Sequence, residues 1–296
     1  MANSGILKGR FGIVTGGSRG IGEAIARNLA AKGCDLLLNY TSASSQGPTE
    51  KLCSELASAH GIRVESVQAD LGKPEEGVQV ILAAAQKFSS SGKLQIDILI
   101  NNAGVSADHN LNDPVRGPIG PENFHWQYAI NVLAPLLLTQ AVAPYLPTDR
   151  SGRIVNVSSV SSSLGFVGQS IYGGTKAALE AMTRTWAREL ADRATVNSIN
   201  PGPVIGDMYF KAGEAFWRDL QGFVDNAPLS KLDLNNKDVT SRLTEDQIRL
   251  INEKMGGRRP AFTSEIAGTV GMLCTPDGAW TTGSVVNANG GMKMVE

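Results

Sequence analysis

Short runs of apolar and β-branched residues recur along the chain, and stretches of helical periodicity separate them. The runs are nearly continuous rather than alternating, which is typical of strands covered by helices on both faces of a sheet. Residues 20–32 and 49–59 have the helical pattern between early runs. Alternating strand and helix predict βαβ units, so we expect an α/β fold with a doubly wound parallel sheet. The expected strands are residues 11–15, 35–39, 63–68, 96–101, 153–157, 195–200 and 283–287.

The segment 208–258 interrupts this alternation, because it is helical and polar and lies between two expected strands. Thr244 and Gln247 have the spacing of a capping box at the start of a helix, and Gly256 is expected to end that helix. An excursion of this length predicts a substrate lid or a pocket wall. We therefore expect a single domain, residues 1–296, with an enlarged helical lid inserted in it.

Composition narrows the class of protein. The chain has 296 residues, 42% of them hydrophobic and 19% charged, with a net charge of -1. This balance excludes a disordered chain and argues against a nucleic-acid partner bound through electrostatic attraction. Glycine occupies 33 positions, so the backbone is expected to turn sharply or approach another group closely at several places.

The sequence predicts a cytoplasmic protein. Cys34, Cys53 and Cys274 cannot all pair and are too far apart for a metal clip, so we expect buried thiols and no metal site. Residues 1–10 contain no apolar run of the signal-peptide kind. Residues 129–146 are the most membrane-like stretch, but polar residues and prolines interrupt it, which predicts a buried helix and no membrane partner.

A glycine-rich loop follows the first expected strand and opens the first expected helix. Its glycines permit a tight turn and close contact with a pyrophosphate, which the N–H groups of the helix terminus attract. It lacks the Gly-Lys-Ser/Thr ending of a P-loop, which argues against an ATPase. Part of it also matches the nucleophile elbow of hydrolases, but the C-terminal half of the chain has no histidine for a triad. The loop is Thr15-Gly16-Gly17-Ser18-Arg19-Gly20-Ile21-Gly22.

The end of the second expected strand indicates which nicotinamide cofactor binds. Chains that bind NAD have a ribose-binding carboxylate here, whereas this chain has Asn39-Tyr40-Thr41-Ser42. Arg19 and the hydroxyls of Thr41 and Ser42 suit a 2′-phosphate, because a guanidinium binds this dianion well and a carboxylate would repel it. We therefore expect NADP(H) as the cofactor.

Candidate acid–base chemistry lies on one expected helix. Tyr172 and Lys176 are four residues apart and share a helix face. A phenol with a pKa of about 10 is a poor catalyst at neutral pH, and a nearby ammonium lowers that pKa. Ser159 follows a strand, so it falls on the same sheet edge as the glycine loop. Two helical glycines, Gly173 and Gly174, indicate a tight contact with a cofactor or another element.

These motifs, in this order and spacing, resemble the short-chain dehydrogenase/reductase family, and especially its ketoacyl-carrier-protein reductases. The resemblance covers the chain outside the segment 208–258 and implies a Rossmann-type fold with a hydride-transfer site. The residues that carry it are Thr15, Gly16, Gly20, Gly22, Asp70, Asn101 to Gly104, Asn131, Ser159, Tyr172, Lys176, Pro201, Gly202 and Asn287 to Met292.

The resemblance implies four catalytic residues. Tyr172 would give a proton to the substrate carbonyl oxygen, and Lys176 would lower the tyrosine pKa and bind the nicotinamide ribose. Ser159 would hydrogen-bond the carbonyl and stabilise its developing charge. Asn131 would hold a water that relays protons to Lys176. Ser158 is the competing serine, but it lies one residue too far from Tyr172 in the sequence.

The resemblance also implies contacts along the whole cofactor. Asp70 and Leu71 would contact the adenine, and residues after other strands would line the middle and the nicotinamide. With the strand-end residues Asn39, Tyr40, Thr41 and Ser42, the expected contacts are Gly16, Ser18, Arg19, Gly20, Ile21, Gly22, Asp70, Leu71, Asn102, Ala103, Gly104, Tyr172, Lys176, Pro201, Gly202 and Val204.

Two departures from the family pattern concern the substrate side. Gly206 stands where the family often has a threonine that binds the carboxamide, and the segment 208–258 replaces a short substrate loop. Residues 106–124, rich in Asp, Asn and Pro, are expected to extend the same rim. Aromatic residues in the lid, among them Trp217 and Phe223, either line an apolar pocket or simply pack together.

The expected function is an NADPH-dependent carbonyl reductase or alcohol dehydrogenase for a small-molecule ketone, with the long lid favouring a bulky secondary-metabolite intermediate. One alternative is a β-ketoacyl thioester reductase, for which Arg258-Arg259 is a candidate carrier contact. Another is a cofactor-binding protein with a sensing or non-redox role. Residues 175–192 have apolar positions on more than one helix face, which predicts a homotetramer or homodimer.

Overall fold

The computed structural model describes residues 5–88, 93–206, 209–210 and 213–294. A seven-stranded sheet with the order β3-β2-β1-β4-β7-β8-β9 forms its centre, and all paired strands in it are parallel. The expected doubly wound α/β fold is therefore confirmed. The strands are β1 (Phe11–Val14), β2 (Asp35–Tyr40), β3 (Val64–Gln68), β4 (Ile98–Asn101), β7 (Gly152–Val157), β8 (Ala194–Ile199) and β9 (Val285–Val286).

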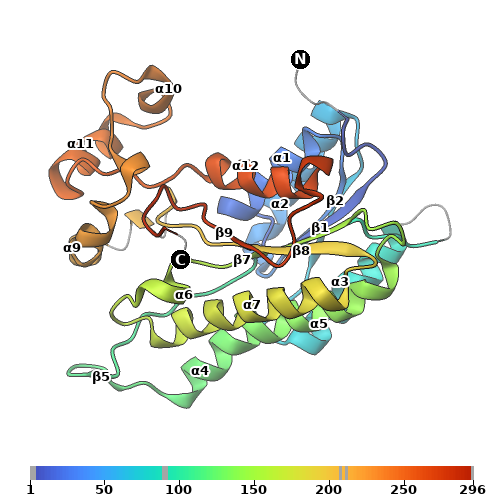
Figure 1. Ribbon diagram of the computed structural model, residues 1–296, viewed down its shortest axis with the longest axis horizontal. Helices are drawn as coiled ribbons and strands as arrows, with labels where there is room; N and C mark the ends of the chain where they lie inside the picture. Colours follow the sequence, from blue (N-terminus) through green and yellow to red (C-terminus); the bar gives the residue numbers. More distant parts are fainter. Residues whose placement is uncertain (1–4, 89–92, 207–208, 211–212, 295–296) are drawn as a thin grey trace.

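Helices cover both faces of this sheet (Figure 1). One layer packs Ile25 and Leu29 of its first helix against the apolar strands, and the opposite layer buries Leu179 and Trp186 in the same way. The first layer consists of α1 (Gly20–Ala30), α2 (Gln46–His60) and α12 (Thr263–Cys274). The second consists of α3 (Pro74–Phe88), α4 (Pro121–Tyr128), α5 (Ala134–Val142) and α7 (Ser170–Glu189).

The strand order reverses between β1 and β4. The chain moves from β1 to β2 and β3 on one side, and from β4 to β7 and β8 on the other. In open parallel sheets, ligands bind beyond the carboxyl ends of the strands at such a point. The fold therefore brings the glycine loop after β1, the segment after β4 and the serines after β7 to one place.

The apolar stretch at residues 129–146 lies in a helical run. Pro121–Tyr145 is long and apolar enough to cross a membrane by length and composition alone. Ala134, Leu138 and Val142 instead belong to the buried cluster between the helices and the sheet, as the sequence predicted. A π-helical turn, η2 (Ala129–Leu133), interrupts the run and carries Asn131.

The expected lid forms a separate helical layer beyond the carboxyl ends of the strands, at the left in Figure 1. Of the segment 208–258, Met208 and residues 211–212 lie outside the described residues. Thr244 and Gln247 make both hydrogen bonds of the predicted capping box, and Gly256 has a positive φ after the helix end. The lid helices are α9 (Gly213–Val224), α10 (Lys237–Thr240) and α11 (Glu245–Lys254).

Candidate active site

The glycine loop between β1 and α1 leaves room for a pyrophosphate. Gly16 and Gly20 have φ values of 62° and 60°, in the left-handed region that favours glycine. A Cβ at Gly22 would lie 2.1 Å from the Gly16 carbonyl oxygen, so no side chain fits there. Helix α1 begins at Gly20 without a side-chain cap, which leaves its first N–H groups free for an anion. This geometry fits the dinucleotide that the sequence predicts.

Neighbouring strands hold the loop in position. The Asn102 side-chain amide donates to the carbonyl oxygens of Thr15 and Gly16, at 2.8 and 3.2 Å. The Thr15 hydroxyl accepts from the backbone N–H groups of Asn102 and Ala103. These hydrogen bonds fix the segment after β4 against the segment after β1. Asn102 therefore contributes to the expected cofactor site by positioning the loop.

The end of β2 divides into a buried pair and an exposed pair. Asn39 is 1% exposed, and its side chain accepts from the Gly16 N–H and donates to the Ala69 carbonyl. Tyr40 is also buried, so neither side chain lies open to a cofactor. Thr41 and Ser42 are exposed, as is Arg19 across the loop. The groups available for a 2′-phosphate are therefore Arg19, Thr41 and Ser42, with Ser18 half-buried beside them.

The remaining expected cofactor residues lie along the same sheet edge. Asp70 is exposed directly after β3, while the Leu71 side chain is buried against the core. Gly202 packs against Asn289, because a Cβ there would lie 3.4 Å from that residue. Gly206 has no atom within 4 Å of an added Cβ, so a threonine side chain would find open space. Distributed between these points are Ile21, Ala103, Gly104, Pro201 and Val204.

Ser159 and Tyr172 meet at the carboxyl end of β7. A hydrogen bond joins the Tyr172 phenol to Ser159 and lowers the phenol pKa, but burial has the larger effect, so the pKa of Tyr172 is raised. The expected lowering by Lys176 is not observed, since the Lys176 ammonium lies 5.6 Å from the centre of the tyrosine ring. The phenol therefore carries the proton that a donor needs, although the raised pKa makes it a weaker acid.

Ser158 points away from this site. Its hydroxyl donates to Glu180 Oε1 at 2.7 Å and is buried beneath helix α7. This arrangement favours Ser159 over Ser158 as the serine that faces a substrate. The tight contact indicated by Gly173 and Gly174 is with protein, because added Cβ atoms would meet the Ser161 carbonyl at 2.7 Å and the Tyr128 hydroxyl at 3.0 Å.

Lys176 is buried on the same helix, where its ammonium donates to the Val157 carbonyl at 2.8 Å. Burial lowers the pKa of Lys176 to about 8, and the Glu180 carboxylate one turn later opposes this shift. A cation with this pKa loses its proton within the working range of an enzyme. Burial therefore dominates the pKa of Lys176, and Glu180, which the sequence did not single out, moderates that shift.

Asn131 uses its side chain to hold the backbone after β4. Its amide donates to the Val105 carbonyl at 2.8 Å, and its Oδ1 accepts from the Val105 N–H at 2.9 Å. The amide also donates to the Thr175 hydroxyl at 3.1 Å, next to Lys176 in helix α7. Asn131 therefore ties three elements of the site together. Its expected role in holding a water stays a prediction.

Replacing Glu180 by Gln is expected to shift the pH dependence of carbonyl reduction. The Lys176 ammonium is present below its pKa and is lost as the pH rises, so reduction should decline above about pH 8. Without the carboxylate, that pKa falls, and the decline in kcat/KM should begin roughly one pH unit lower. Glu189→Gln, at the exposed end of the same helix, is the matched control. An unchanged alkaline limb in Glu180→Gln would contradict this role.

A chain of polar side chains extends from Ser159 to the rim, and the sequence did not reveal it. The Ser159 hydroxyl donates to Ser161 at 3.0 Å, and Ser161 donates to Gln169 Oε1 at 2.7 Å. The Gln169 amide then donates to Asp108 at 3.2 Å, which also accepts from Ser106 at 2.8 Å. The only sequence signal was the polar composition of residues 106–124. That segment forms a hairpin of β5 (Asn112–Asp113) and β6 (Gly117–Pro118).

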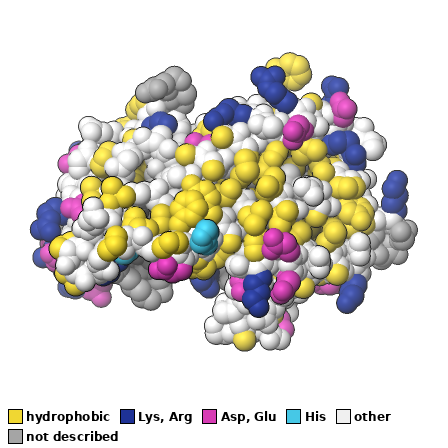
Figure 2. Space-filling view, turned by 90° about the horizontal axis from the view of Figure 1, so that it is seen from below, with side chains coloured by type: hydrophobic (Ala, Val, Ile, Leu, Met, Phe, Trp, Pro, Cys, Tyr) yellow, Lys and Arg dark blue, Asp and Glu magenta, His cyan; other side chains and the backbone are white. Residues whose placement is uncertain are grey.

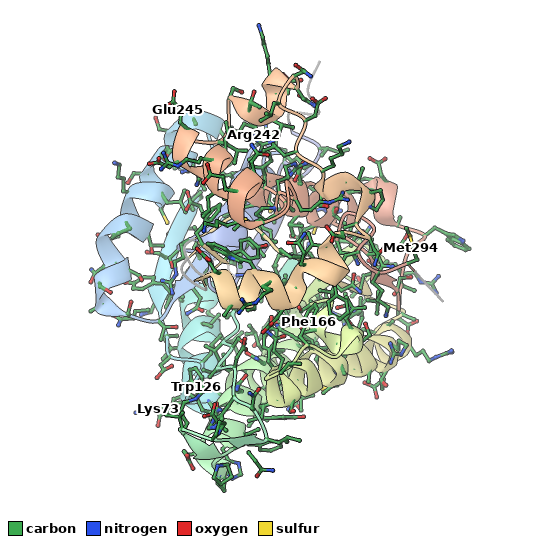
Figure 3. The ribbon with its side chains drawn as sticks, turned by 90° about the vertical axis from the view of Figure 1, so that its left-hand side faces the viewer. Lys73, Trp126, Phe166, Arg242, Glu245 and Met294 are labelled. Carbon is green, nitrogen blue, oxygen red and sulfur yellow. The ribbon has the colours of Figure 1, made fainter. Side chains whose placement is uncertain are left out.

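The lid has its own apolar core beside this rim. Trp217 is 5% exposed and donates to the Tyr209 carbonyl at 2.9 Å, and Tyr209 packs edge-on against Phe210 and Phe216. Most of the lid aromatics are therefore packed together. Figure 3, which looks onto this side of the molecule, shows Phe166 beneath α9. Its ring lies 4.9 Å from that of Phe223, which joins the lid to the loop before α7.

The basic pair Arg258-Arg259 is paired within the lid region. Arg259 forms two hydrogen bonds with the Glu265 carboxylate, at 2.8 and 3.0 Å. Arg258 lies 3.4 Å from Asp225. Neither guanidinium is a free cation for an acidic carrier protein. Arg259 thereby links the end of the lid to α12, whereas the Arg258–Asp225 pair lies within the lid.

Comparisons with known proteins agree with this geometry. A family model described as short chain dehydrogenase matches residues 11–215. An L-xylulose reductase of Aspergillus niger is 67% identical over 292 residues, which cover 97% of this chain and 98% of that protein. An L-xylo-3-hexulose reductase of Hypocrea jecorina is 59% identical over 297 residues, which cover 97% of each. The crystal structure of a blue fluorescent protein from a metagenomic library, in complex with NADPH, is 32% identical with a TM-score of 0.78, covering 97% of this chain and 99% of that one.

Proposed function

The chain belongs to the short-chain dehydrogenase/reductase family, and from this premise we propose that it is an NADPH-dependent reductase of small polyhydroxylated ketones. It is an oxidoreductase of that family. The relatives named for L-xylulose and L-xylo-3-hexulose are ketose reductases by name, and both match almost the whole chain. They favour a ketose over the bulky metabolite that the long lid suggested.

The polar chain beside Ser159 is the observation that carries this substrate class. Ser161, Gln169 and Asp108 extend a line of a hydroxyl, an amide and a carboxylate from Ser159 to the rim. A ketose offers hydroxyl groups to such side chains. An apolar ketone offers no hydroxyl groups to these side chains and forgoes such hydrogen bonds, each of which contributes about 0.5–1.5 kcal/mol. The packed aromatic core of the lid leaves little reason to expect an apolar substrate.

The chain's own residues account for the proton transfer. Bound NADPH supplies the hydride. Tyr172, kept protonated by burial, donates its phenolic proton to the substrate carbonyl oxygen. Ser159 hydrogen-bonds that oxygen as negative charge develops on it. Lys176 holds a positive charge near the phenol, and Asn131 fixes the segment around Val105 that borders it. The proposed catalytic residues are Asn131, Ser159, Tyr172 and Lys176.

The preference for NADP(H) follows from the exposed groups at the end of β2. Thr41 and Ser42 offer hydroxyls there, and no carboxylate competes for the ribose 2′ position. Arg19 lies at the N-terminus of α1, where its guanidinium and the helix dipole both favour a phosphate. The structural relative solved with NADPH supports the same cofactor.

NADPH consumption with a graded set of ketones tests the proposal. L-Xylulose is expected to give a kcat/KM about 100-fold above that of 2-pentanone, because the polar rim is satisfied only by the ketose hydroxyls. Gln169→Leu should reduce the value for L-xylulose about tenfold and leave that for 2-pentanone unchanged. Gln221→Leu, in lid helix α9, is the matched control. A β-ketoacyl thioester or 2-pentanone reduced as well as L-xylulose would refute the ketose assignment.

Assembly, lid and location remain proposals. Apolar side chains gather in a band across the face formed by the α4, α5 and α7 layer (Figure 2). Phe124 and Trp126 of α4 are 43% and 44% exposed there, which suits a second copy of the chain in a homodimer or homotetramer.

We propose that residues 208–258 act as the substrate lid of a single domain 1–296, and a cytoplasmic location stays a prediction.

A further inference from the structure

A cavity of about 370 Å³ lies at the amino-terminal edge of the sheet, away from the lid and the proposed active site. Residues that precede or begin β1, β4 and β7 form its floor, namely Arg10, Asp97 and Arg153. This volume falls within the range of small-molecule sites, about 300–1,000 Å³. The motifs described in the sequence analysis lie at the carboxyl ends of the strands, and none of them includes a residue of this cavity.

Arg153 is the unusual residue of this cavity. It is 6% exposed, yet among the described residues no carboxylate forms an ion pair with it. Its Nη1 donates to the carbonyl oxygens of Arg150 and Gly152, at 3.0 and 2.7 Å, and its Nε has no hydrogen-bond partner. Burying a cation without an acid costs several kcal/mol. Burial correspondingly lowers the pKa of Arg153.

The acids that line the cavity are already engaged by other groups. Asp97 accepts from the Arg10 guanidinium at 2.7 Å. Asp149 accepts from the backbone N–H of Ser151 at 3.0 Å and from its hydroxyl. Arg150, with a φ of 64°, is a third arginine that lines the cavity. Three arginines and two aspartates leave one positive charge without an acid in the cavity.

The rest of the wall is apolar. Ile6 and Leu7 line one part of the cavity, and Pro276 and Ala279 line another. A ligand that matches this lining has one negative oxygen-bearing group for Arg153 and a short hydrocarbon part for the wall. A hydrated inorganic anion would leave the apolar wall uncovered.

We propose that this cavity binds a small aliphatic carboxylic acid, whose carboxylate pairs with Arg153 and whose chain packs against Leu7, Pro276 and Ala279. A planar guanidinium forms bidentate hydrogen bonds with a carboxylate, and Arg153 lines the cavity without an ion-paired acid among the described residues. The single charge of a carboxylate balances the one that the cavity leaves unpaired. The site lies on the opposite edge of the sheet from the proposed cofactor site, so the acid and the cofactor can bind at the same time.

Calorimetric titration of the full chain with butyrate tests this site, with NADPH saturating so that its phosphate-binding groups are occupied. Butyrate is expected to bind at one site, and butan-1-ol and inorganic phosphate at equal ionic strength to bind at least about tenfold more weakly. Arg153→Gln should weaken butyrate binding about tenfold or more, and the exposed Arg116→Gln should not. Phosphate binding as tightly as butyrate would overturn the assignment.

A second variant provides a test that does not require the Arg153→Gln protein to fold. Ala279 is exposed at the mouth of the cavity, so Ala279→Phe fills it from the surface without removing a buried group. This variant should lose butyrate binding and retain the wild-type kcat with L-xylulose. Unchanged butyrate affinity in Ala279→Phe would show that the acid binds elsewhere and refute the proposal. If the wild-type protein binds butyrate but does not reduce L-xylulose, the proposed function is wrong and the proposed acid site still stands.

Discussion

Replacing Tyr172 by Phe is expected to lower kcat for ketose reduction by about a thousandfold, within the usual contribution of a positioned acid. The Tyr172 phenol hydrogen-bonds to Ser159, and burial raises its pKa, so the phenol is protonated. The substitution removes the oxygen and retains the ring, so packing is preserved. Stopped-flow NADPH oxidation measures the chemical step, and fluorescence titration should give a Kd for NADPH within about twofold of the wild type.

Tyr128→Phe is the matched control for this variant. The Tyr128 hydroxyl also lies against helix α7, near Gly174, but among the described residues no hydrogen bond joins it to Ser159 or Lys176. It should retain activity close to that of the wild type. Full turnover in Tyr172→Phe would remove the proposed mechanism and would favour the alternative in which the fold binds its cofactor without redox chemistry.

The sheet was predictable because its strands are buried on both faces. Residues 11–15, 35–39 and 153–157 are nearly continuous runs of apolar and β-branched residues, and each is a strand within one residue of the expected bounds. The last strand was predicted less well. Only Val285–Val286 pairs with β8, although the expected strand covered residues 283–287. A run of apolar residues therefore indicated where the strand lies but not how far its hydrogen-bonded ladder extends.

The candidate site was predictable to the extent that it depends on strand ends and helix faces. Ser159 follows β7, and Tyr172 and Lys176 share a face of α7, so the parallel topology alone brings them to one edge. The balance of pKa effects was not predictable. It depends on burial and on Glu180, and the sequence suggested only that an ammonium would lower the tyrosine pKa.

Contacts between segments that are distant along the chain could not be predicted from the sequence. Gln169 meets Asp108 across 61 residues of chain, and nothing in either local pattern specifies that hydrogen bond. Asn39 was expected at the cofactor because it ends a strand, but the pleat turns its side chain into the protein, where it supports Gly16. Because helices cover both faces of the sheet, Asn39 and its neighbour Tyr40 are both buried, and a position at a strand end does not reveal this.

Replacing Gly22 by Ala is expected to weaken NADPH binding by about 10- to 100-fold, because the glycine loop must move. The added Cβ would lie 2.1 Å from the Gly16 carbonyl oxygen and 2.6 Å from the Asn102 amide nitrogen. The first contact is with backbone, which cannot rotate away, and such overpacking costs about 1–3 kcal/mol. The displaced segment carries the N–H groups proposed to bind the pyrophosphate. Fluorescence titration gives the Kd, and Tm measures the loss of stability.

Substitutions of two further glycines distinguish the effect of this steric clash from other effects of adding a methyl group. Gly47 lies in α2 with nothing within 4 Å of its Cβ, so Gly47→Ala should bind NADPH as the wild type does. Gly20 also has open space but a φ of 60°, so Gly20→Ala introduces backbone strain without a clash. If contact with Gly16 is decisive, Gly22→Ala loses more affinity than Gly20→Ala. Equal losses in the two variants would show that backbone conformation, rather than close packing of α1 on the loop, sets the pyrophosphate geometry.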